Sequence, residues 1–340
     1  MMSTIGDNAR LLSNDVQAKW LIEDFPFRIQ LASVFPFYPV AGDALRYTTT
    51  PVLQPGVTIG FEEGIVEDTK MPNDASRVFS FAEIATQFRV SYKAQDIFSS
   101  NVNDQVSVQM ALAIRELLYK FWTLFESGDS VNAGEFDGLH KLADPSRVLD
   151  LGFQPLTLEV LEQGKELVRT NDGRGTVLFT NSTGKRAIHA AHWTRGLTPQ
   201  YTDMIFPCPR NENQAEQVLT FDGAPVYVND LNQNLGGSPD APDGEPVPEN
   251  PLAPDSAGTG TNIWFFSMGE NNLHGMTPAA LDTGLFVTRS TMLPDGSTLV
   301  YHVTMPASIA LGSASSLAVI KNAVIPAQRS PLIDFDIRGA

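Results

Sequence analysis

Two histidines three residues apart form the pair of side chains in this sequence that is best spaced to hold a metal ion. His189 and His192 share one face if residues 182–195 form a helix. No Glu lies between them, and Lys185 and Arg195 place positive charge on the same helix, which disfavours a cation. A metal-dependent enzyme that uses this pair is one alternative, and an ordinary amphipathic helix is the simpler interpretation.

Other catalytic patterns are incomplete. Near Gly184 and Lys185, Phe179 stands where a phosphate-binding loop requires glycine. Cys208 is the single cysteine and lies between two prolines, so it excludes an internal disulfide and a cysteine-ligated zinc site. Acidic residues near position 62 are interpreted as solvated rather than as a cation site. We therefore predict no catalytic, cofactor-binding or metal-binding residue, and we expect a protein that is not an enzyme.

The first half of the chain predicts elements that cannot bury themselves. Residues 1–43 resemble an arm, because two aromatic–proline clusters cannot form a regular helix or a central strand. The arm covers either another surface or its own domain. Residues 44–95 predict a two-stranded ribbon with strands at 45–52 and 78–92, and an isolated ribbon is marginally stable in water.

The clearest helix is predicted over residues 104–126, where apolar residues recur every three or four positions. A mixed α/β region follows. Its predicted elements are helices at 157–169 and 182–195, the second capped by Ser182, strands at 176–180 and 263–266, and hairpins around 222–223 and 294–296. Residues 236–260 contain six prolines and five acidic residues, without Lys or Arg, and resemble a loop that lies against a partner.

The composition of the chain disfavours membrane-spanning, secreted and nucleic-acid-binding proteins. The 340 residues predict about two domains, and no apolar run approaches the roughly 18 residues of a spanning helix. The first ten residues lack a basic lead and an apolar core, which predicts no signal peptide and synthesis in a reducing compartment. The net charge of −16 disfavours a protein that grips nucleic acid, because phosphate binding needs clustered Lys and Arg.

The order of these elements resembles that of tailed-bacteriophage major capsid proteins of the HK97-like fold, an α+β fold. The resemblance covers roughly residues 25–325. The stretches that carry it are Glu62-Glu63-Gly64, Val90-Ser91-Tyr92-Lys93-Ala94-Gln95-Asp96, Val102-Asn103-Asp104-Gln105, Glu135-Phe136-Asp137-Gly138-Leu139 and the hairpin segment 221–230.

The resemblance implies six regions. They are an N-terminal arm (1–43), an extended loop or E-loop (44–95), a peripheral domain (96–154) with a spine helix at 104–126, an axial domain (155–275) that includes the 236–260 loop, further peripheral strands (276–320) and a C-terminal segment (321–340).

The same resemblance implies a shell protein that self-assembles into pentamers and hexamers of an icosahedral phage head around double-stranded DNA. The implied partners are further copies of the chain and a portal protein, with a separate scaffolding protein and a decoration protein as options, and with no membrane. The implied location is the virion, and the host cytoplasm before assembly. No cofactor is expected. An encapsulin-like cellular compartment is the alternative that has the same fold.

Residues expected to contact neighbouring subunits share a position in the arm, the ribbon or the segment after the long helix. They are Trp20, Phe25, Phe27, Phe35, Phe37, Tyr38, Glu62, Glu63, Lys70, Arg77, Phe79, Phe81, Phe136 and Asp137. Some members of the family crosslink a loop lysine to an asparagine with the help of a glutamate. Lys70 is available, but residues 274–320 contain neither Asn nor Glu, so we predict no covalent crosslinking.

Overall fold

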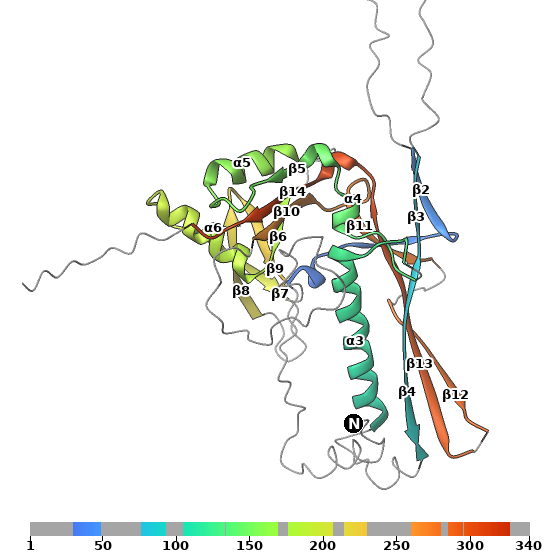
Figure 1. Ribbon diagram of the computed structural model, residues 1–340. Coiled ribbons are helices and arrows are strands. Elements are labelled where there is room, and N and C mark those ends of the chain that lie inside the picture. Colours follow the sequence, from blue (N-terminus) through green and yellow to red (C-terminus); the bar gives the residue numbers. More distant parts are fainter. Residues whose placement is uncertain are drawn as a thin grey trace, which may run out of the picture. The chain divides into compact units, whose positions relative to one another are not determined.

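In the computed structural model the chain folds into two compact units (Figure 1). Unit 1 contains Phe37–Lys141 and His274–Ser313, and unit 2 contains Phe27–Pro36, Leu142–Leu273 and Ala314–Ala340. The structure describes residues 30–48, 76–92, 105–132, 134–168, 176–206, 214–229, 260–279, 285–294 and 296–326. Residues 1–29 of the predicted arm, the middle of the ribbon (residues 49–75) and nearly all of the 236–260 loop lie outside these residues.

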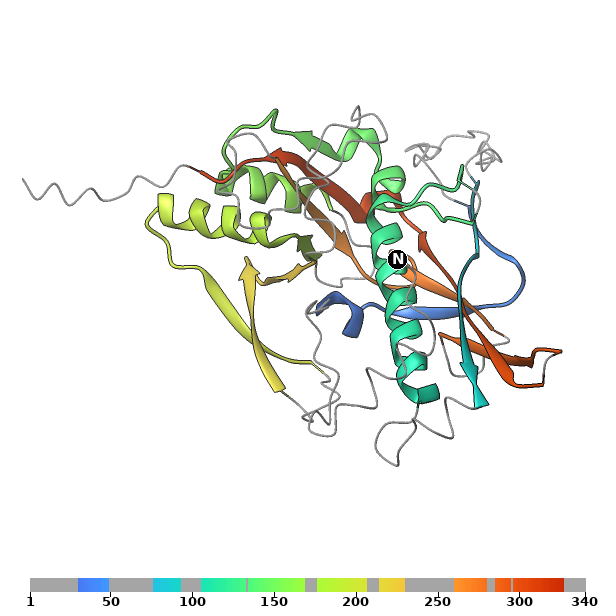
Figure 2. The ribbon, with the colours of Figure 1, turned by 60° about the horizontal axis from the view of Figure 1, so that its bottom comes forward.

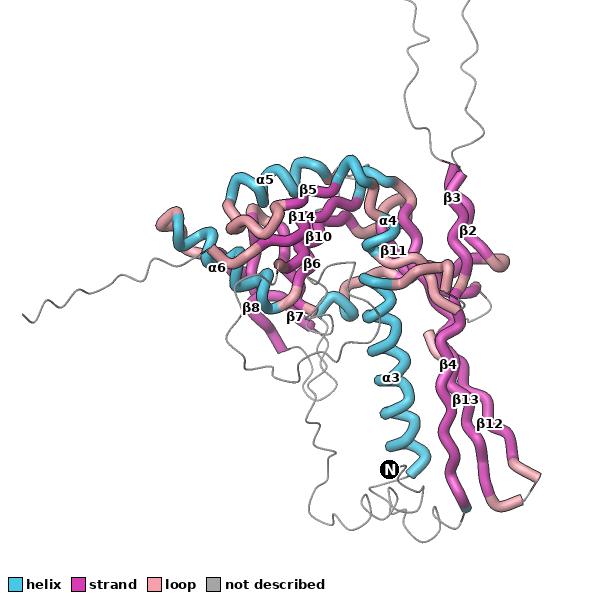
Figure 3. The backbone as a smooth tube through the Cα atoms, in the orientation of Figure 1, coloured by secondary structure: helices cyan, strands magenta, loops and turns pink. Residues whose placement is uncertain are grey.

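A five-stranded sheet forms the framework of unit 1. Its strands are β1 (Phe37–Val40), β4 (Ala82–Ser91), β11 (Leu273–Pro278), β12 (Val287–Met292) and β13 (Thr298–Leu311). The long strand β13 pairs antiparallel with β12 on one side and with β4 on the other, and the three strands run side by side in Figure 3. β1 joins the edge of the sheet parallel to β11. The hairpin predicted to turn at 294–296 is therefore present as β12–β13.

The ribbon predicted in the sequence begins as a separate two-stranded sheet. β2 (Ala44–Thr48) pairs antiparallel with β3 (Ser76–Ser80). The strand predicted over 78–92 is interrupted at Phe81, after which β4 alternates buried and exposed residues in its first half. This interruption lets one continuous stretch of sequence serve two different sheets.

The long helix α3 (Gln105–Ser127) lies where the spacing of apolar residues predicts a helix. Its C-terminal half is the better buried half, and its fully or nearly fully buried side chains include Leu117, Phe121, Trp122 and Phe125. At about 1.5 Å per residue, a helix of 23 residues is roughly 35 Å long. α3 packs against β4, so it supports the sheet of unit 1.

Unit 2 is built on a seven-stranded sheet in the order β5-β14-β10-β6-β9-β8-β7. The strands are β5 (Val148–Asp150), β6 (Thr176–Thr180), β7 (Gln200–Phe206), β8 (Gln214–Phe221), β9 (Ala224–Val228), β10 (Thr261–Ser267) and β14 (Leu317–Ala323). β10 is central and buried nearly throughout, which suits its run Ile263-Trp264-Phe265-Phe266. β7 lies at one edge and β5 at the other.

Two helices pack on the same face of this sheet, α5 (Leu158–Leu167) and α6 (Ser182–Thr194) (Figure 2). Leu161 of α5 and Ile188 of α6 belong to one buried apolar cluster together with Leu178 and Phe265 of the sheet. Gly164 allows α5 to approach closely, since a Cβ atom there would lie 2.8 Å from the Phe265 ring. The two helices therefore form a layer over one face of the sheet of unit 2.

The cap of α6 differs from the prediction by one residue. Asn181, not Ser182, is the N-cap, because its side-chain oxygen accepts a 2.8 Å hydrogen bond from the amide of Gly184. Asn and Ser are both good N-cap residues, so sequence alone could not decide between them. Asn181 also accepts a 2.6 Å hydrogen bond from the hydroxyl of Thr261, which ties the start of α6 to β10.

Short elements complete the described chain. They are the 3-10 helices η1 (Gln30–Ser33), η2 (Pro145–Arg147) and η3 (Ala314–Ser316) and the single-turn helix α4 (Leu139–Leu142). No helix in the described residues combines the length and the apolar character needed to span a membrane.

Candidate subunit-contact region

An aromatic cluster surrounds the buried end of α3 in unit 1. The ring of Phe121 is completely buried, and its centroid lies 5.7 Å from Phe37, 5.4 Å from Phe136 and 5.5 Å from Trp122. Phe37 comes from β1 and Phe136 comes from the loop after α3. Two of the predicted contact residues, Phe37 and Phe136, therefore attach β1, the strand near the end of the arm, and the loop after α3 to the core of their own chain.

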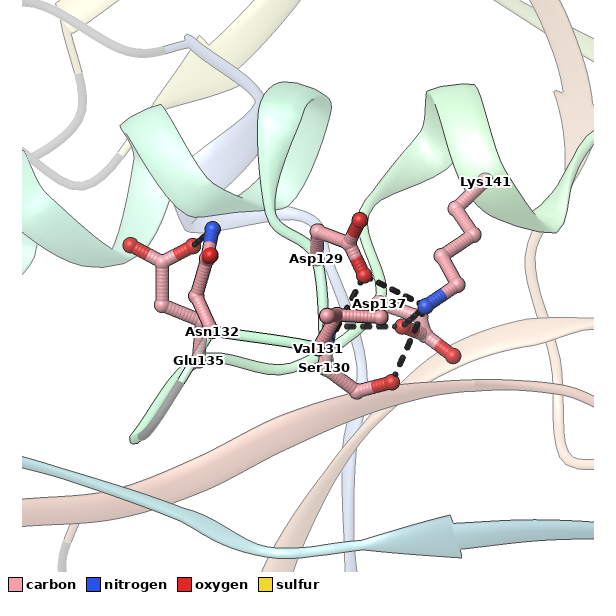
Figure 4. A network of polar contacts seen from close by, with 7 residues as sticks. All are labelled: Asp129, Ser130, Val131, Asn132, Glu135, Asp137 and Lys141. Atoms are coloured by element: carbon pink, nitrogen blue, oxygen red, sulfur yellow. Dashed lines mark hydrogen bonds and ion pairs between the residues drawn. The ribbon is translucent and has the colours of Figure 1, made fainter.

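The loop after α3 is held by a network centred on Lys141 (Figure 4). The Lys141 ammonium contacts a carboxylate oxygen of Asp129, lies 3.0 Å from Asp137 and donates a 3.1 Å hydrogen bond to Ser130. The Ser130 amide donates a 2.8 Å hydrogen bond to Asp137. Burial raises the pKa of Asp137, but the hydrogen bonds from Ser130 and Lys141 outweigh it and hold that pKa below its ordinary value. The predicted contact residue Asp137 thus stabilises this loop.

A second group of polar contacts holds the other half of the same loop. The Asn132 amide donates a 3.1 Å hydrogen bond to Glu135, and Lys120 of α3 lies 3.4 Å from the same carboxylate. These contacts, led by the one from Asn132, lower the pKa of Glu135. Val131 between the two groups is 82% exposed. The loop is therefore a braced structure that presents an apolar side chain to its surroundings.

Strand β1, near the end of the arm, and strand β2 of the ribbon both contact His274 in unit 1. The buried His274 ring on β11 has Tyr38 of β1 at a centroid distance of 5.3 Å and Tyr47 of β2 at 6.1 Å. The Tyr47 hydroxyl lies 3.3 Å from Nε2 of His274. Tyr47 also contacts the ring of the buried Phe79, which belongs to β3. The predicted residues Tyr38 and Phe79 thus belong to a group of aromatic contacts around His274 and Tyr47. These contacts attach the base of the ribbon to the sheet of unit 1.

Sequence reasoning missed His274 and Tyr47, which lie 227 positions apart. The one sequence feature that marks this position is the glycine that follows His274, because it allows another strand to approach closely. A Cβ atom at Gly275 would lie 2.3 Å from the ring of Phe37, so only glycine lets β1 pair here. A lone histidine in an apolar stretch carries no comparable signal.

The remaining predicted contact residues fall into two groups. Within the described chain, Phe35 is buried, and Arg77 and Phe81 are partly buried. The other six lie outside the described residues and keep their status as predictions: Trp20, Phe25, Phe27, Glu62, Glu63 and Lys70.

The histidine pair on α6 is engaged in packing. Nδ1 of the buried His192 lies 2.8 Å from the carbonyl oxygen of Ile188, and its ring packs edge-on against Phe221. His189 instead contacts Tyr201, whose hydroxyl lies 3.0 Å from Nε2. Within the described residues, no group of three or more His, Cys, Asp and Glu side chains is arranged to hold a metal ion. The geometry assigns both histidines to packing within unit 2.

No family model and no curated protein matches the sequence. Solved structures do match, nearly end to end. One is the SrpI encapsulin complex from Synechococcus elongatus PCC 7942, with a TM-score of 0.66, 16% identity and coverage of 96% of this chain and 97% of that chain. Another is the capsid of an empty GTA particle, with a TM-score of 0.62, 11% identity and coverage of 91% and 94%.

A third match is a structure of Microbacterium phage Oxtober96, with a TM-score of 0.53, 10% identity and coverage of 94% of this chain and 99% of that chain. These proteins share a fold and little sequence with the present chain. The α+β fold is therefore the HK97-like fold of capsid and encapsulin shells, as the sequence resemblance predicts.

Proposed function

We propose that this chain is the major capsid protein of a tailed bacteriophage and that it assembles into the pentamers and hexamers of an icosahedral head. The observation that carries the proposal is the likeness of 91–96% of the chain to proteins whose structures are shells. The described residues form buried cores in both units and a loop after α3 that is held by several polar contacts.

The two units suggest how the regions of such a subunit are distributed. We assign the peripheral domain to unit 1, with α3 as the spine helix and β2–β3 as the base of the E-loop. We assign the axial domain to unit 2. These assignments place the boundaries after Lys141 and Ser313, because β5 and β14 pair with each other in the sheet of unit 2. Residues 1–43 would be the N-terminal arm.

The charge of the chain suits a container for double-stranded DNA. A net charge of −16 gives a wall that repels phosphate, so DNA can be packed and released without adhering. Such a shell requires a portal protein, and it takes a separate scaffolding or decoration protein where its own contacts are insufficient. The chain would occupy the virion and, before assembly, the host cytoplasm.

An encapsulin-like compartment is the second candidate function. The observation that favours it is the likeness to the SrpI encapsulin complex, at a TM-score of 0.66. The two candidates differ in contents rather than in subunit structure: a phage head encloses DNA, and a compartment encloses protein cargo.

Electron microscopy of the purified protein tests both candidates. Closed shells or five- and six-fold capsomers are expected, and a chain that stays monomeric across salt and pH would contradict both. Nuclease-protected double-stranded DNA in particles from the native source would select the phage head, and a stoichiometric protein cargo would select the compartment. A single band at 37.0 kDa on a denaturing gel of boiled particles is expected, whereas a ladder of multiples would contradict the absence of crosslinks.

A further inference from the structure

Unit 2 carries a partly exposed surface in which basic and aromatic side chains lie together, here called the basic–aromatic surface. Its members are Lys185, Arg186, His189 and Trp193 of α6 and Tyr201 of β7. Trp193 is 55% exposed and Tyr201 is 46% exposed. Trp, Tyr and Arg side chains are enriched among the residues that contribute most to binding at protein interfaces.

The aromatic part of this surface is ordered by contacts within the chain. The His189 ring lies between the other two rings, at a centroid distance of 5.8 Å from each, and meets both nearly edge-on. Nε2 of His189 lies 3.0 Å from the Tyr201 hydroxyl. The three rings therefore form a pre-ordered group, which loses little conformational entropy when a partner covers it. Leu197, just beyond α6, is also 53% exposed.

The neighbouring helix α5 has an outward face of opposite charge, here called the acidic face. Glu159, Glu162 and Glu166 are spaced three and four residues apart, so they lie on one side of the helix, and all three are exposed. Glu159 already forms an ion pair with Arg195 of the same chain. Glu162 and Glu166 thus supply the part of the face that is best placed to meet another molecule.

The two surfaces lie on neighbouring helices of unit 2, and the ion pair between Glu159 and Arg195 joins these helices. α5 packs against β14, next to the β5 edge, whereas Tyr201 belongs to β7, the strand at the other edge. The two surfaces are different, so a contact between the basic–aromatic surface of one copy and the acidic face of the next joins copies head to tail. Contacts of this kind close into rings when each copy is rotated by a constant angle from the last.

We propose that the basic–aromatic surface of one copy binds the acidic face of α5 on the next copy, and that repetition of this contact closes the five- and six-membered rings of the shell. The inference rests on the proposed shell function and names the partner surface within it. Charge complementarity sets the direction of the contact, and Trp193 and Tyr201 supply its apolar anchors.

Paired charge reversals test the contact. The acid-swapped chain carries Glu162→Lys and Glu166→Lys, and the base-swapped chain carries Lys185→Glu and Arg186→Glu. Each is expected to be folded by circular dichroism and to form no rings, because like charges then face each other across the contact. A chain with all four substitutions keeps the wild-type net charge and regains complementarity, so it is expected to assemble and serves as the matched control.

Mixing the two swapped chains gives a sharper readout. Each chain then complements only the other, so they must alternate around a ring, and alternation closes only in even numbers. Six-fold rings without five-fold rings are therefore expected by electron microscopy. In addition, Trp193→Ala in the wild-type background should raise the protein concentration needed for assembly at least tenfold.

The outcomes separate this inference from the proposed function. Wild-type shells together with normal assembly of either swapped chain would overturn the head-to-tail contact alone. Failure of the folded four-substitution chain would also overturn it, since its complementarity is restored. Wild-type protein that remains monomeric under every condition would overturn both proposals.

Discussion

Replacing Gly138 by alanine tests how the loop after α3 is closed. A Cβ atom at Gly138 would lie 2.6 Å from the amide nitrogen of Gly128 and from the carbonyl oxygen of Leu124, whereas ordinary contacts begin at 3.4 Å. The loop and the helix end must then separate by about 0.8 Å, the difference between these distances. The Gly138 amide also donates a 2.8 Å hydrogen bond to the carbonyl oxygen of Gly128, and this separation would break that bond.

The expected cost follows from these two effects. Overpacking a rigid site costs about 1–3 kcal/mol, and the lost hydrogen bond costs about 1 kcal/mol. Gly138→Ala should therefore lower the free energy of local unfolding at the C-terminal end of α3 by about 2–4 kcal/mol. This change corresponds to a roughly 30- to 700-fold increase in the equilibrium constant for local unfolding. The measurement is hydrogen–deuterium exchange of peptides that cover residues 117–127 in the unassembled protein.

Two substitutions in the same loop serve as controls. Val131→Ala changes an exposed side chain and should leave exchange within about 0.5 kcal/mol of the wild type. Gly134 has a φ of +85° and nothing within 4 Å of its Cβ position, so Gly134→Ala measures backbone strain alone and should affect only the loop. If Gly138→Ala exchanged like Val131→Ala, the close approach would not govern the helix end, and the reasoning would be refuted.

Three further predictions concern a core side chain and two titrating groups. Phe121→Ala should destabilise unit 1 by about 3–5 kcal/mol, because the ring of Phe121 is completely buried. Tyr119→Ala, at an exposed position, should cost under about 1 kcal/mol, and urea unfolding of the two variants measures the difference. The lowered pKa of Asp137 stabilises the folded chain above the unfolded value of 3.8, and this contribution is lost as the pH falls through the folded value, so Asp137→Asn should flatten acid unfolding there. Burial, with a smaller effect of the positive Lys185, lowers the pKa of His189. The folded chain then binds fewer protons than the unfolded chain, and stability of unit 2 falls as the pH drops below 6.5; equal pH slopes in His189→Gln and the wild type would contradict this.

Elements defined by local pattern were predictable from the sequence. The three- and four-residue spacing of apolar side chains located α3 within about one residue at either end. The Asp222-Gly223 pair predicted the β8–β9 hairpin, and both residues adopt the positive φ angles, 46° and 76°, that a tight hairpin turn requires. In these cases neighbouring residues alone determine the conformation.

Pairings between distant segments were not predictable in the same way. β1 pairs parallel with β11, and β5 pairs parallel with β14, in registers set by tertiary packing. The same limit applies to the contact residues. Aromatic side chains in a proline-rich or loop segment suit either the chain's own core or a neighbour's surface, and only the structure places Phe79 and Phe136 in the core. Burial within one chain is a property of three-dimensional arrangement, which composition does not contain.

The late position of two strands has a consequence for synthesis on the ribosome. Ala82 of β4 pairs with Ala307 of β13, and the sheet of unit 2 needs β14, which ends at Ala323. At about 5–20 residues per second, β4 waits roughly 10–45 s for its partner strand. Neither unit can finish folding until β13 and β14 emerge from the ribosome. The order of strands along the chain thus delays completion of both sheets until β13 and β14 have been synthesised.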